Sequence, residues 1–408
     1  MTTDTDILIA GGGLNGASLA LALAGVGLRV TLVDLLSKDT RADPEFDGRG
    51  YALALTSVRM LKVLGVWNAV EDKAQPILDI KVADGRPNQG ASPLYVHFDH
   101  HEIEEGPMGH MLEDRFLRQA LLNAVAAEAR ITHLSQVAVV SQEVAPGHVD
   151  VGLSDGNTQA ARLLVGCDGR QSEVATRAGI SRTGWDYTQA SLVCAVRHEK
   201  PHGGCAHQLF LPSGPLAILP LPGNRSSVVW TETRDRAVAI QAMPPEAYLD
   251  ALRPVFGNFL GEISLDGGRF LYPLGLSLAN RIVAQRVALV GDAAHGIHPL
   301  AGQGLNLGLR DVAALAEVLA DAARRGEDYG TAAALRPYET WRRFDIAALA
   351  AATDGINRLF SNDNTFLRGI RDIGLGLANA LPGVRKGMIR EAAGLTGDLP
   401  RLMQGLKV

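Results

Sequence analysis

The segment from Gly291 to Gly308, GDAAHGIHPLAGQGLNLG, has a composition suited to holding a ligand against bare backbone. It contains five glycines, two histidines and a single carboxylate, that of Asp292. The apolar run RVALV precedes it and predicts a buried strand, and LRDVAALAEVLADAARR follows it and predicts a helix. Because N–H groups at the start of a helix attract negative charge, the segment predicts a ligand site between a strand and a helix.

A second glycine-rich turn lies at the N-terminus. Residues 6–10 (DILIA) predict a buried strand, GGGLNG follows as a G-x-G-x-x-G pattern, and ASLALALAG predicts a helix. Gly11 would allow the tight turn, Gly13 the approach of a pyrophosphate, and Gly16 close packing of helix and strand. A second strand, RVTLVD, ends at Asp34, where an adenosine ribose would be bound. Together these features predict dinucleotide binding.

Strands that end in an acidic residue recur far along the chain. LLVGCDG ends at Asp168 and Gly169, and VALVGDAAH passes through Asp292. A nicotinamide cofactor alone would need only one continuous N-terminal domain. Because these strand ends are spread over so much of the chain, they favour one long cofactor, FAD, held by distant segments.

Other chemistries are weaker interpretations of these residues. Asp292, His295 and His298 are spaced at i, i+3 and i+6, but zinc sites use three or four ligands in a defined geometry, so we expect no metal. His298 is interpreted as a packing or hydrogen-bonding residue beside the cofactor. The histidines of residues 96–106 (VHFDHHEIEEG) are expected in a solvated loop. No G-x-S-x-G sequence or convincing Ser/His/Asp order predicts a protein nucleophile.

Three signatures, GGGLNG, CDGRQS and GDAAHGIHPLAGQGLNLGLRD, occur in the order and at the approximate spacing of one family. The chain resembles the class A FAD-dependent aromatic hydroxylases, which share the para-hydroxybenzoate hydroxylase fold, over nearly its whole length. The resemblance implies an α/β protein with a discontinuous Rossmann-like FAD-binding domain, a β-sheet substrate domain and a helical C-terminus.

The resemblance also implies roles for individual residues. The first glycine turn would bind the FAD pyrophosphate, and Asp34 the adenosine ribose. Arg49 and Arg115 match two arginines that lie near the cofactor in the family. Asp168 falls in the segment that touches both FAD and a visiting NAD(P)H. The backbone of Val137 is the expected partner of the adenine.

The opening segment would hold the flavin itself. The resemblance implies that Asp292 binds the ribityl chain and that the backbone of 300–305 follows the pyrimidine edge of the ring. His298 and Pro299 would lie near the flavin, with Pro299 stiffening the approach to its reactive edge. The cofactor-binding residues implied in this way are Gly11, Gly13, Leu14, Asn15, Gly16, Asp34, Arg49, Arg115, Val137, Asp168, Gly291, Asp292, Ala301, Gly302, Gln303, Gly304, Leu305 and Asn306.

The family's chemistry is that of a monooxygenase. NAD(P)H reduces FAD, O₂ adds at flavin C4a, and the resulting hydroperoxide hydroxylates an electron-rich aromatic ring. The flavin performs the hard step, so no catalytic side chain is expected with certainty. The pocket must exclude water, because the hydroperoxide otherwise decays.

Three further stretches resemble the ubiquinone-biosynthesis branch of the family: HPLAGQGLNLGLRD, FLPSGPLAILPLP (210–222) and REAAGLTGDLPRLMQG (390–405). That branch oxidises a polyprenylated phenol, which implies an apolar channel and contact with a membrane surface or a complex of biosynthetic proteins. Residues 210–222 are either a wall over the flavin or plain sheet core. Two alternatives stay open: hydroxylation of a small soluble aromatic, and a non-catalytic FAD-bound component of a biosynthetic complex. A flavin halogenase is disfavoured because W-x-W-x-x-I-P is absent.

The elements that must position these motifs divide into three regions. Residues 1–75, 100–180 and 265–335 are expected to form the FAD-binding domain, and 76–99 with 181–264 the β-rich substrate domain, whose apolar runs are broken by Gly and Pro. Residues 336–408 are expected to be largely helical. Within them, 370–395 could form an amphipathic surface for a membrane or partner, or an ordinary packing helix.

Composition bounds the remaining possibilities. The 408 residues are 47% hydrophobic and 20% charged, which is typical of a folded protein with more than one lobe. A net charge of −5 argues against nucleic-acid binding, and three widely spaced cysteines fit a reducing cytoplasm. Residues 7–28 carry no charge, but their glycines and the acidic residues before them disfavour a membrane span or signal peptide. We therefore expect a cytoplasmic protein, with peripheral membrane contact as one option.

Overall fold

The computed structural model describes residues 3–43, 49–88, 90–360, 376–377 and 379–408, except for the side chain of Ala301. Its first sheet has eight strands. Six follow one another in the order β17 (Val283–Ala284), β18 (Val287–Leu289), β11 (Thr158–Gly166), β1 (Thr5–Ala10), β2 (Val30–Asp34) and β8 (Ile131–Ser135). The other two, β10 (His148–Leu153) and β9 (Val139–Ala145), extend from β11 as antiparallel strands.

The centre of this sheet is parallel and covered on both faces. Strand β1 pairs in parallel with both β11 and β2, and its residues Ile7, Leu8 and Ile9 are fully buried. An unbroken apolar run is what a parallel strand buried on both faces requires. Helix α1 (Leu14–Gly25) follows β1 and packs against α8 (Gln303–Arg324) and α4 (Asp114–Ala127).

The second large sheet also has eight strands and is mostly antiparallel. Their order is β19 (His295–Gly296), β16 (Ile263–Ala279), β12 (Arg182–His198), β15 (Arg225–Thr233), β14 (Gly214–Leu221), β13 (Cys205–Leu211), β5 (Asp79–Arg86) and β6 (Gly90–Asp99). Helices α6 (Arg234–Gln241) and α7 (Pro245–Phe256) enclose a core with one face of it, around the buried rings of Trp230 and Tyr248.

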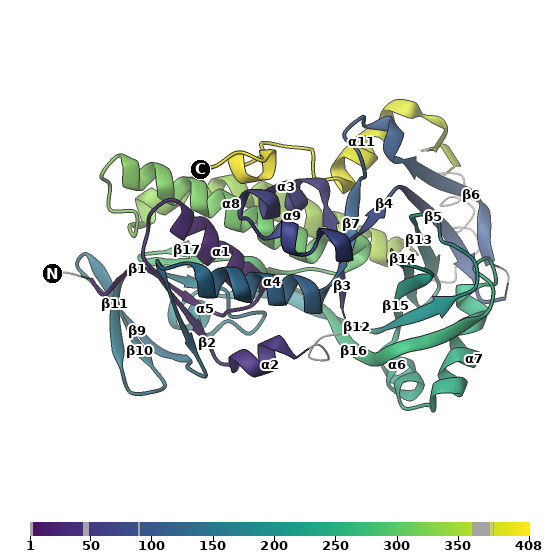
Figure 1. Ribbon diagram of the computed structural model, residues 1–408, viewed down its shortest axis with the longest axis horizontal. Helices are drawn as coiled ribbons and strands as arrows, with labels where there is room; N and C mark the ends of the chain where they lie inside the picture. The colour runs from purple at the N-terminus through teal and green to yellow at the C-terminus, as the bar shows by residue number, and fades with distance from the viewer. Residues whose placement is uncertain (1–2, 44–48, 89, 361–375, 378) are drawn as a thin grey trace.

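A small sheet and several helices join the two halves. The small sheet has the order β3 (Gly50–Ala54), β7 (Gly109–Glu113) and β4 (Gln75–Ile77). The remaining α-helices of the described residues include α2 (Lys38–Ala42), α3 (Leu55–Val63), α5 (Glu173–Arg177), α9 (Ala332–Phe360) and α11 (Pro382–Ala392). Figure 1 shows the first sheet at one end of the long axis and the second at the other, with α11 against β6.

The expected fold class is confirmed, but one expected boundary falls inside a strand. Residues 76–99 and 181–264 supply β5, β6 and β12 to β15 of the second sheet. The boundary at 265 lies within β16, which pairs with β12 from Ile263 to Ala279 and so belongs to the second sheet. Helix α9 also begins at Ala332, a few residues before the expected helical region.

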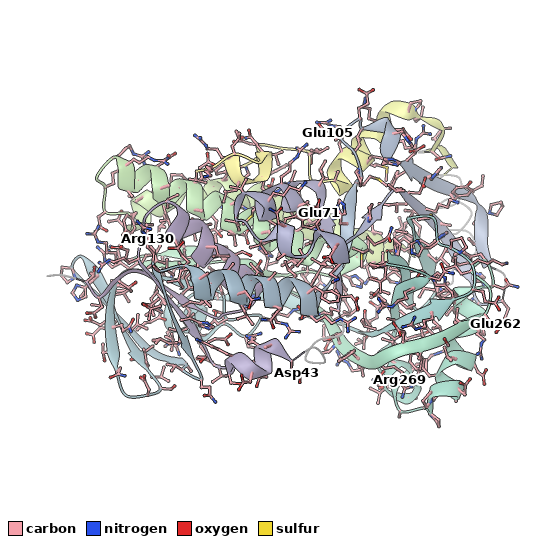
Figure 2. All side chains as sticks on the ribbon, viewed as in Figure 1. Asp43, Glu71, Glu105, Arg130, Glu262 and Arg269 are labelled. Carbon is pink, nitrogen blue, oxygen red and sulfur yellow. The ribbon has the colours of Figure 1, made fainter. Side chains whose placement is uncertain are left out.

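The outer surface carries charged side chains at both ends of the molecule, for example Arg130 beside the first sheet and Glu262 beside the second (Figure 2). Within the described ranges, no helix has both the length and the apolar character needed to cross a bilayer.

Candidate cofactor and substrate site

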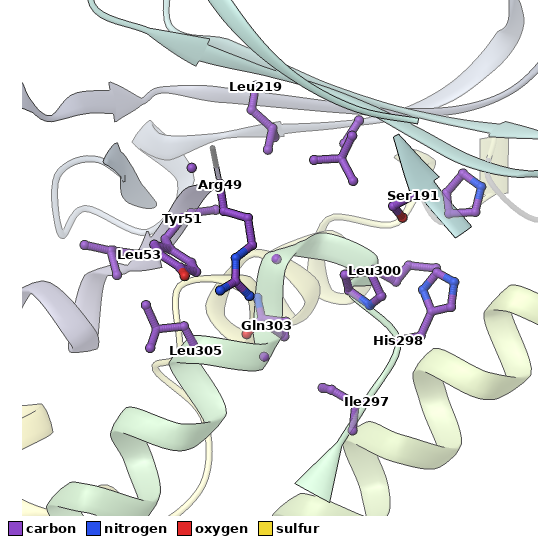
Figure 3. Close-up of a pocket in the computed structure, with 18 of the residues that line it drawn as sticks. Arg49, Tyr51, Leu53, Ser191, Leu219, Ile297, His298, Leu300, Gln303 and Leu305 are labelled. Atoms are coloured by element: carbon purple, nitrogen blue, oxygen red, sulfur yellow. The ribbon is translucent and has the colours of Figure 1, made fainter. Parts of the chain in front are cut away.

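A cavity of about 830 Å³ lies at the start of α8, between the first and second sheets. Figure 3 shows Arg49, Gln303 and Leu305 on one side of it and Leu219 of the second sheet on the other. The lining residues on the side of the first sheet include Gly13, Leu14, Asn15, Arg41, Arg49, Asp114, Arg118, Cys167, Arg170, Asp292, Ile297, His298, Pro299, Leu300, Gly302, Gln303, Gly304 and Leu305.

The glycines of the first turn have three different environments. Gly11 has a φ of +109°, and a Cβ there would lie 2.3 Å from the carbonyl oxygen of Cys167. A Cβ on Gly16 would lie 1.9 Å from the carbonyl oxygen of Gly11, so the helix can approach the turn this closely only without one. A Cβ on Gly13 would meet no atom within 4 Å, and Gly13 lines the cavity. No side chain caps α1, so the start of the helix is suited to a phosphate group.

Asn15 connects the two glycine-rich segments. A Cβ on Gly291 would lie 2.2 Å from Asn15 Nδ2, and a Cβ on Gly308 would lie 2.4 Å from the same atom. The buried Oδ1 of Asn15 has no hydrogen-bond partner among the described residues. Two segments nearly 300 residues apart in sequence therefore meet at one side chain that lines the cavity.

A buried ionic network holds the turn that contains Asp292. The carboxylate of Asp311, which has no exposed surface, accepts hydrogen bonds from Gly291 N at 3.0 Å and Arg342 Nε at 2.7 Å. It also lies 2.5 Å from His295 Nε2. Burial raises the pKa of Asp311, but the charges of His295 and Arg342 outweigh this and leave the pKa lowered. His295 therefore supports the turn, and no group of metal-ligating side chains is found at this site in the described residues.

Asp292 itself is half-exposed and lines the cavity. Its Oδ2 lies 3.5 Å from Nε of Arg170, another lining residue, and its carbonyl oxygen accepts a hydrogen bond from Arg182 Nη2 at 3.1 Å. The backbone is thus fixed while the carboxylate stays accessible from the cavity.

The segment from Leu300 to Leu305 presents backbone to the cavity. Gly302 has a φ of +65° and is the N-cap of α8, with no side-chain cap, and a Cβ on Gly304 would meet no atom within 4 Å. Gly302, Gln303, Gly304 and Leu305 all line the cavity. This is the second uncapped helix start at the site, and it favours a group on which negative charge develops.

His298 is a fully buried histidine that lines the same cavity, next to Pro299. Neither ring nitrogen has a hydrogen-bond partner among the described residues, and the ring makes an edge contact with Tyr187 at 5.3 Å. Burial lowers its pKa to about 4, so the imidazole is neutral at physiological pH. A neutral imidazole can donate or accept one hydrogen bond to a molecule in the cavity.

Four of the residues implicated by sequence are engaged elsewhere. Asp168 accepts hydrogen bonds from Ser172 Oγ at 2.6 Å and Val174 N at 3.1 Å at the start of α5, and it does not line the cavity. Asn306 accepts from Ala54 N at 2.9 Å and donates to Ala52 O at 2.7 Å, so it ties α8 to β3. The remaining two are Arg115 and Val137.

Arg118, one turn from Arg115 on α4, lines the cavity, whereas Arg115 does not. Arg115 Nη2 donates to Glu113 Oε1 at 2.9 Å, whereas Arg118 donates to Asp114 Oδ2 at 2.7 Å. The i,i+4 pairing of Asp114 with Arg118 is the sequence signal that would have favoured Arg118. Val137 does not line the cavity, and its N–H donates to the carbonyl oxygen of Asp34 at 3.0 Å.

Asp34 forms a buried ion pair. Its Oδ2 accepts from Arg41 Nε at 2.8 Å, and its Oδ1 accepts from Leu36 N at 3.0 Å. Arg41, rather than Asp34, lines the cavity. A ribose bound by Asp34 would have to share this carboxylate with Arg41. The side chain of Ala301 lies outside the described residues.

The opposite wall of the cavity is largely apolar and comes mainly from the second sheet. Along β14, Pro215, Ala217 and Leu219 line the cavity, while the alternate residues Leu216 and Ile218 are buried in the core under α6 and α7. Alternate residues of a strand face opposite sides of a sheet. Residues 210–222 were expected to form either a wall over the flavin or sheet core, and in β14 one set of alternate residues lines the cavity while the other set is in the core. Further lining residues are Ile77, Ile80, Val82, Val96, Phe98, Met108, Ser191, Val193, Phe210, Val229, Tyr272, Leu274, Phe360, Met388 and Ala392.

The residues present fit FAD on structural grounds. The open space at Gly13, the unpartnered Oδ1 of Asn15 and two uncapped helix starts all adjoin one cavity. An elongated dinucleotide with phosphates in its middle and a redox ring at one end matches this set.

Comparison with known proteins gives related sequences and folds. The sequence pattern of the family described as FAD binding domain matches residues 4–352. The ubiquinone hydroxylase UbiL of Rhodospirillum rubrum is 45% identical over 98% of this chain and 93% of its own. The 3-demethoxyubiquinol 3-hydroxylase of Escherichia coli is 34% identical over 96% of this chain and 99% of its own. The p-nitrophenol 4-monooxygenase PnpA of Pseudomonas putida shares the fold, with a TM-score of 0.81 at 20% identity over 97% of this chain and 99% of its own.

Proposed function

Because the chain belongs to the FAD-binding family that includes the ubiquinone hydroxylases, we propose that it is an FAD-dependent monooxygenase hydroxylating the ring of a prenylated phenol in ubiquinone biosynthesis. The cofactor, the monooxygenase class and the pathway follow from the family and from relatives aligned over nearly the full chain. The observation that supports the prenylated substrate is a single cavity in which a cofactor site faces an extended apolar wall.

The chain's own residues would hold and orient the cofactor. The start of α1 would bind the pyrophosphate, Asp292 a hydroxyl of the sugar-like chain, and the start of α8 the edge of the ring. When bound, FAD supplies the redox chemistry that transfers one oxygen atom from O₂ to the substrate ring. The partial positive charge at the start of α8 stabilises negative charge at that edge.

The apolar wall would hold the substrate and keep the site dry. Leu219, Val229 and Tyr272 face the cofactor side, and His298 offers one hydrogen bond that can orient the phenol hydroxyl. The lining also includes Val96 and Phe98 on β6, which add apolar surface for a prenyl tail. Excluding water protects the oxygen-transfer step from hydrolytic loss. We propose NADH or NADPH as the reductant.

The test uses FAD-loaded protein with NADH or NADPH, O₂, and two phenols with the same ring, one prenylated and one without a tail. We expect the prenylated phenol to gain one oxygen atom, detected by mass spectrometry, with a higher kcat/KM than the tailless one. Equal kcat/KM values would instead indicate a hydroxylase of small aromatics. FAD that neither nicotinamide reduces, with no oxygenated product, would indicate a non-catalytic component.

A further inference from the structure

Exposed apolar side chains gather where α11 lies against β6. We call this surface the β6–α11 face and define it by Leu94, Leu381, Val384 and Met388. These four side chains are each 41–48% exposed, although they are large and apolar. Soluble surfaces rarely group such residues unless the patch contacts another molecule or a membrane.

Specific contacts hold the face together. The Oδ1 atom of Asn379 accepts a hydrogen bond from His97 N at 3.0 Å, and Arg385 Nε donates to Glu102 Oε1 at 2.9 Å. Ile389, next to Met388 in α11, is fully buried in a core shared with β6. The helix is therefore anchored, and its exposed stripe is a fixed part of the fold.

The face is continuous with the cavity along both elements. Leu381 is the N-cap of α11, and within the helix Val384, Met388 and Ala392 are spaced by four residues and so share one side. The last two of these line the cavity. An apolar row therefore leads along α11 from exposed surface into the site.

Strand β6 carries a second row. Leu94, Val96 and Phe98 alternate with outward residues and therefore point to the same side of the strand. Val96 and Phe98 line the cavity, whereas Leu94 is exposed on the face. Two neighbouring elements thus carry apolar rows that run from the cavity lining to the same surface.

The charge on the face distinguishes among partners. Helix α11 has three basic residues and one acidic residue, in a chain whose net charge is −5. Arg385 is paired with Glu102, but Lys386 and Arg390 form no ion pair with a described carboxylate. Lys386 and Arg390 are each two residues from a residue of the apolar stripe and so lie on the other side of α11. An amphipathic helix with an apolar side and a basic side matches an anionic lipid bilayer, whose interior accepts the stripe and whose headgroups attract the charges.

We propose that the β6–α11 face docks on an anionic lipid bilayer, so that a membrane-dissolved substrate enters the cavity directly from the lipid. The substrate part of this inference rests on the proposed function. The docking itself requires no turnover and is tested separately.

The first experiment measures flotation of FAD-loaded protein with vesicles of phosphatidylcholine, with and without phosphatidylglycerol. The test variant is Leu381→Glu/Val384→Glu. The control is Val140→Glu/Val144→Glu, which places the same two charges at exposed apolar residues of β9, at the other end of the molecule (Figure 1). We expect the vesicle affinity of the test variant to be at least about tenfold lower than that of the wild type, because each substitution replaces an apolar side chain that would leave water on binding. The control should bind vesicles like the wild type.

The second experiment tests the charge. Lys386→Gln is expected to weaken binding to anionic vesicles about fivefold, the change that corresponds to about 1 kcal/mol per basic residue at such a surface. Lys200→Gln, an exposed lysine away from the face, is the matched control and is expected to have no effect. Neither variant should alter the weaker binding to neutral vesicles.

Several results would overturn docking on lipid. These are wild-type protein that does not float with either vesicle, a test variant that floats like the wild type, or a dimer that Leu381→Glu/Val384→Glu dissociates without any vesicle binding. The last would assign the face to a second copy of the chain. Hydroxylation of a detergent-dispersed prenylated phenol without vesicle binding would refute the docking alone. Vesicle binding without oxidation of any phenol would refute the proposed function alone.

Discussion

His298 combines complete burial with two ring nitrogens that have no hydrogen-bond partner among the described residues. A buried polar group left in this state costs free energy, which a bound molecule with a hydroxyl group can recover. The edge contact with Tyr187, whose hydroxyl donates to Asp354 Oδ1 at 2.9 Å, fixes the orientation of the imidazole. The residue is therefore placed to orient a ligand, and burial lowers its pKa so that the ring is neutral at physiological pH.

The pKa of His298 predicts a pH dependence of stability in the FAD-free protein. Above about pH 6.5 the imidazole is neutral in both the folded and unfolded states. Between pH 6.5 and the folded pKa of about 4, only the unfolded chain takes up the proton, so the free energy of unfolding falls as the pH falls. We expect this residue to contribute a loss of about 2 kcal/mol between pH 7 and pH 5, measured by urea unfolding. His298→Gln should show a shallower dependence, and an identical slope in both proteins would refute the assignment.

Asp292 is the accessible carboxylate of the cofactor site. We expect Asp292→Ala to weaken FAD binding at least about tenfold, because a charge-assisted hydrogen bond contributes about 1.5–3 kcal/mol. Asp321→Ala removes a carboxylate of nearly equal exposure, 51% against 50%, from the distal part of α8 and serves as the control. Titration with FAD, followed by flavin fluorescence, gives both dissociation constants. Equal values for the two variants would show that Asp292 does not contact the cofactor.

The sequence indicates which positions border the cavity where the backbone determines them, and less directly where side chains compete. Gly13 was placed at the cavity because a G-x-G-x-x-G turn leaves only one of its glycines open to a ligand. Arg115 and Arg118 lie on one helix a turn apart, and only the tertiary structure shows which one faces the cavity. The roles expected of Asp168 and Asn306 stay predictions, and in the structure local hydrogen bonds to α5 and β3 engage their side chains.

At the scale of elements, the two helix starts depend on glycines that allow close contact. Helix α1 approaches the preceding turn so closely that the Cα of Gly16 lies over the carbonyl of Gly11. Gly25 is the last residue of the same helix, and a Cβ added there would meet no atom within 4 Å. The two positions differ in packing, although both are helical glycines.

This difference gives a matched pair of variants. Gly16→Ala should lower the free energy of unfolding by about 1–3 kcal/mol or more, because the new methyl group overlaps main-chain atoms that cannot move aside. Gly25→Ala should be neutral or stabilise by up to about 1 kcal/mol, since alanine favours the helix. Thermal unfolding of the FAD-free variants measures both. Similar midpoints for the two would mean that the turn can relax around a side chain.

Strand β16 runs across the boundary expected at residue 265. Its sequence contains Gly267, Gly268 and Pro273, residue types that normally interrupt strands. The structure keeps one long strand and absorbs the irregularity in two register shifts against β12. The apolar wall of the cavity was hard to predict, because its residues come from strands that only the folded sheet brings together.

For the whole molecule, the cavity is the place where both halves contribute to one binding site. FAD bound there stabilises the folded state by mass action, by about 2.7 kcal/mol when its concentration is a hundred times the dissociation constant. Because the cavity is lined by both halves, we expect slower amide exchange in β14 as well as in the β1–α1 turn when FAD is added. Strand β9, which contributes no lining residue, is the internal reference. Protection confined to the first sheet would show that FAD does not couple the halves.

The position of Asn15 between Gly291 and Gly308 has a consequence for how this protein can vary. Gly291 and Gly308 lie at the two ends of one segment, and both pack against the side-chain amide of Asn15. Inserting or deleting one residue between them would move one glycine out of register and place a larger side chain against that amide. The chain between these two points therefore has a fixed length, whereas surface loops such as the β9–β10 turn are free to lengthen.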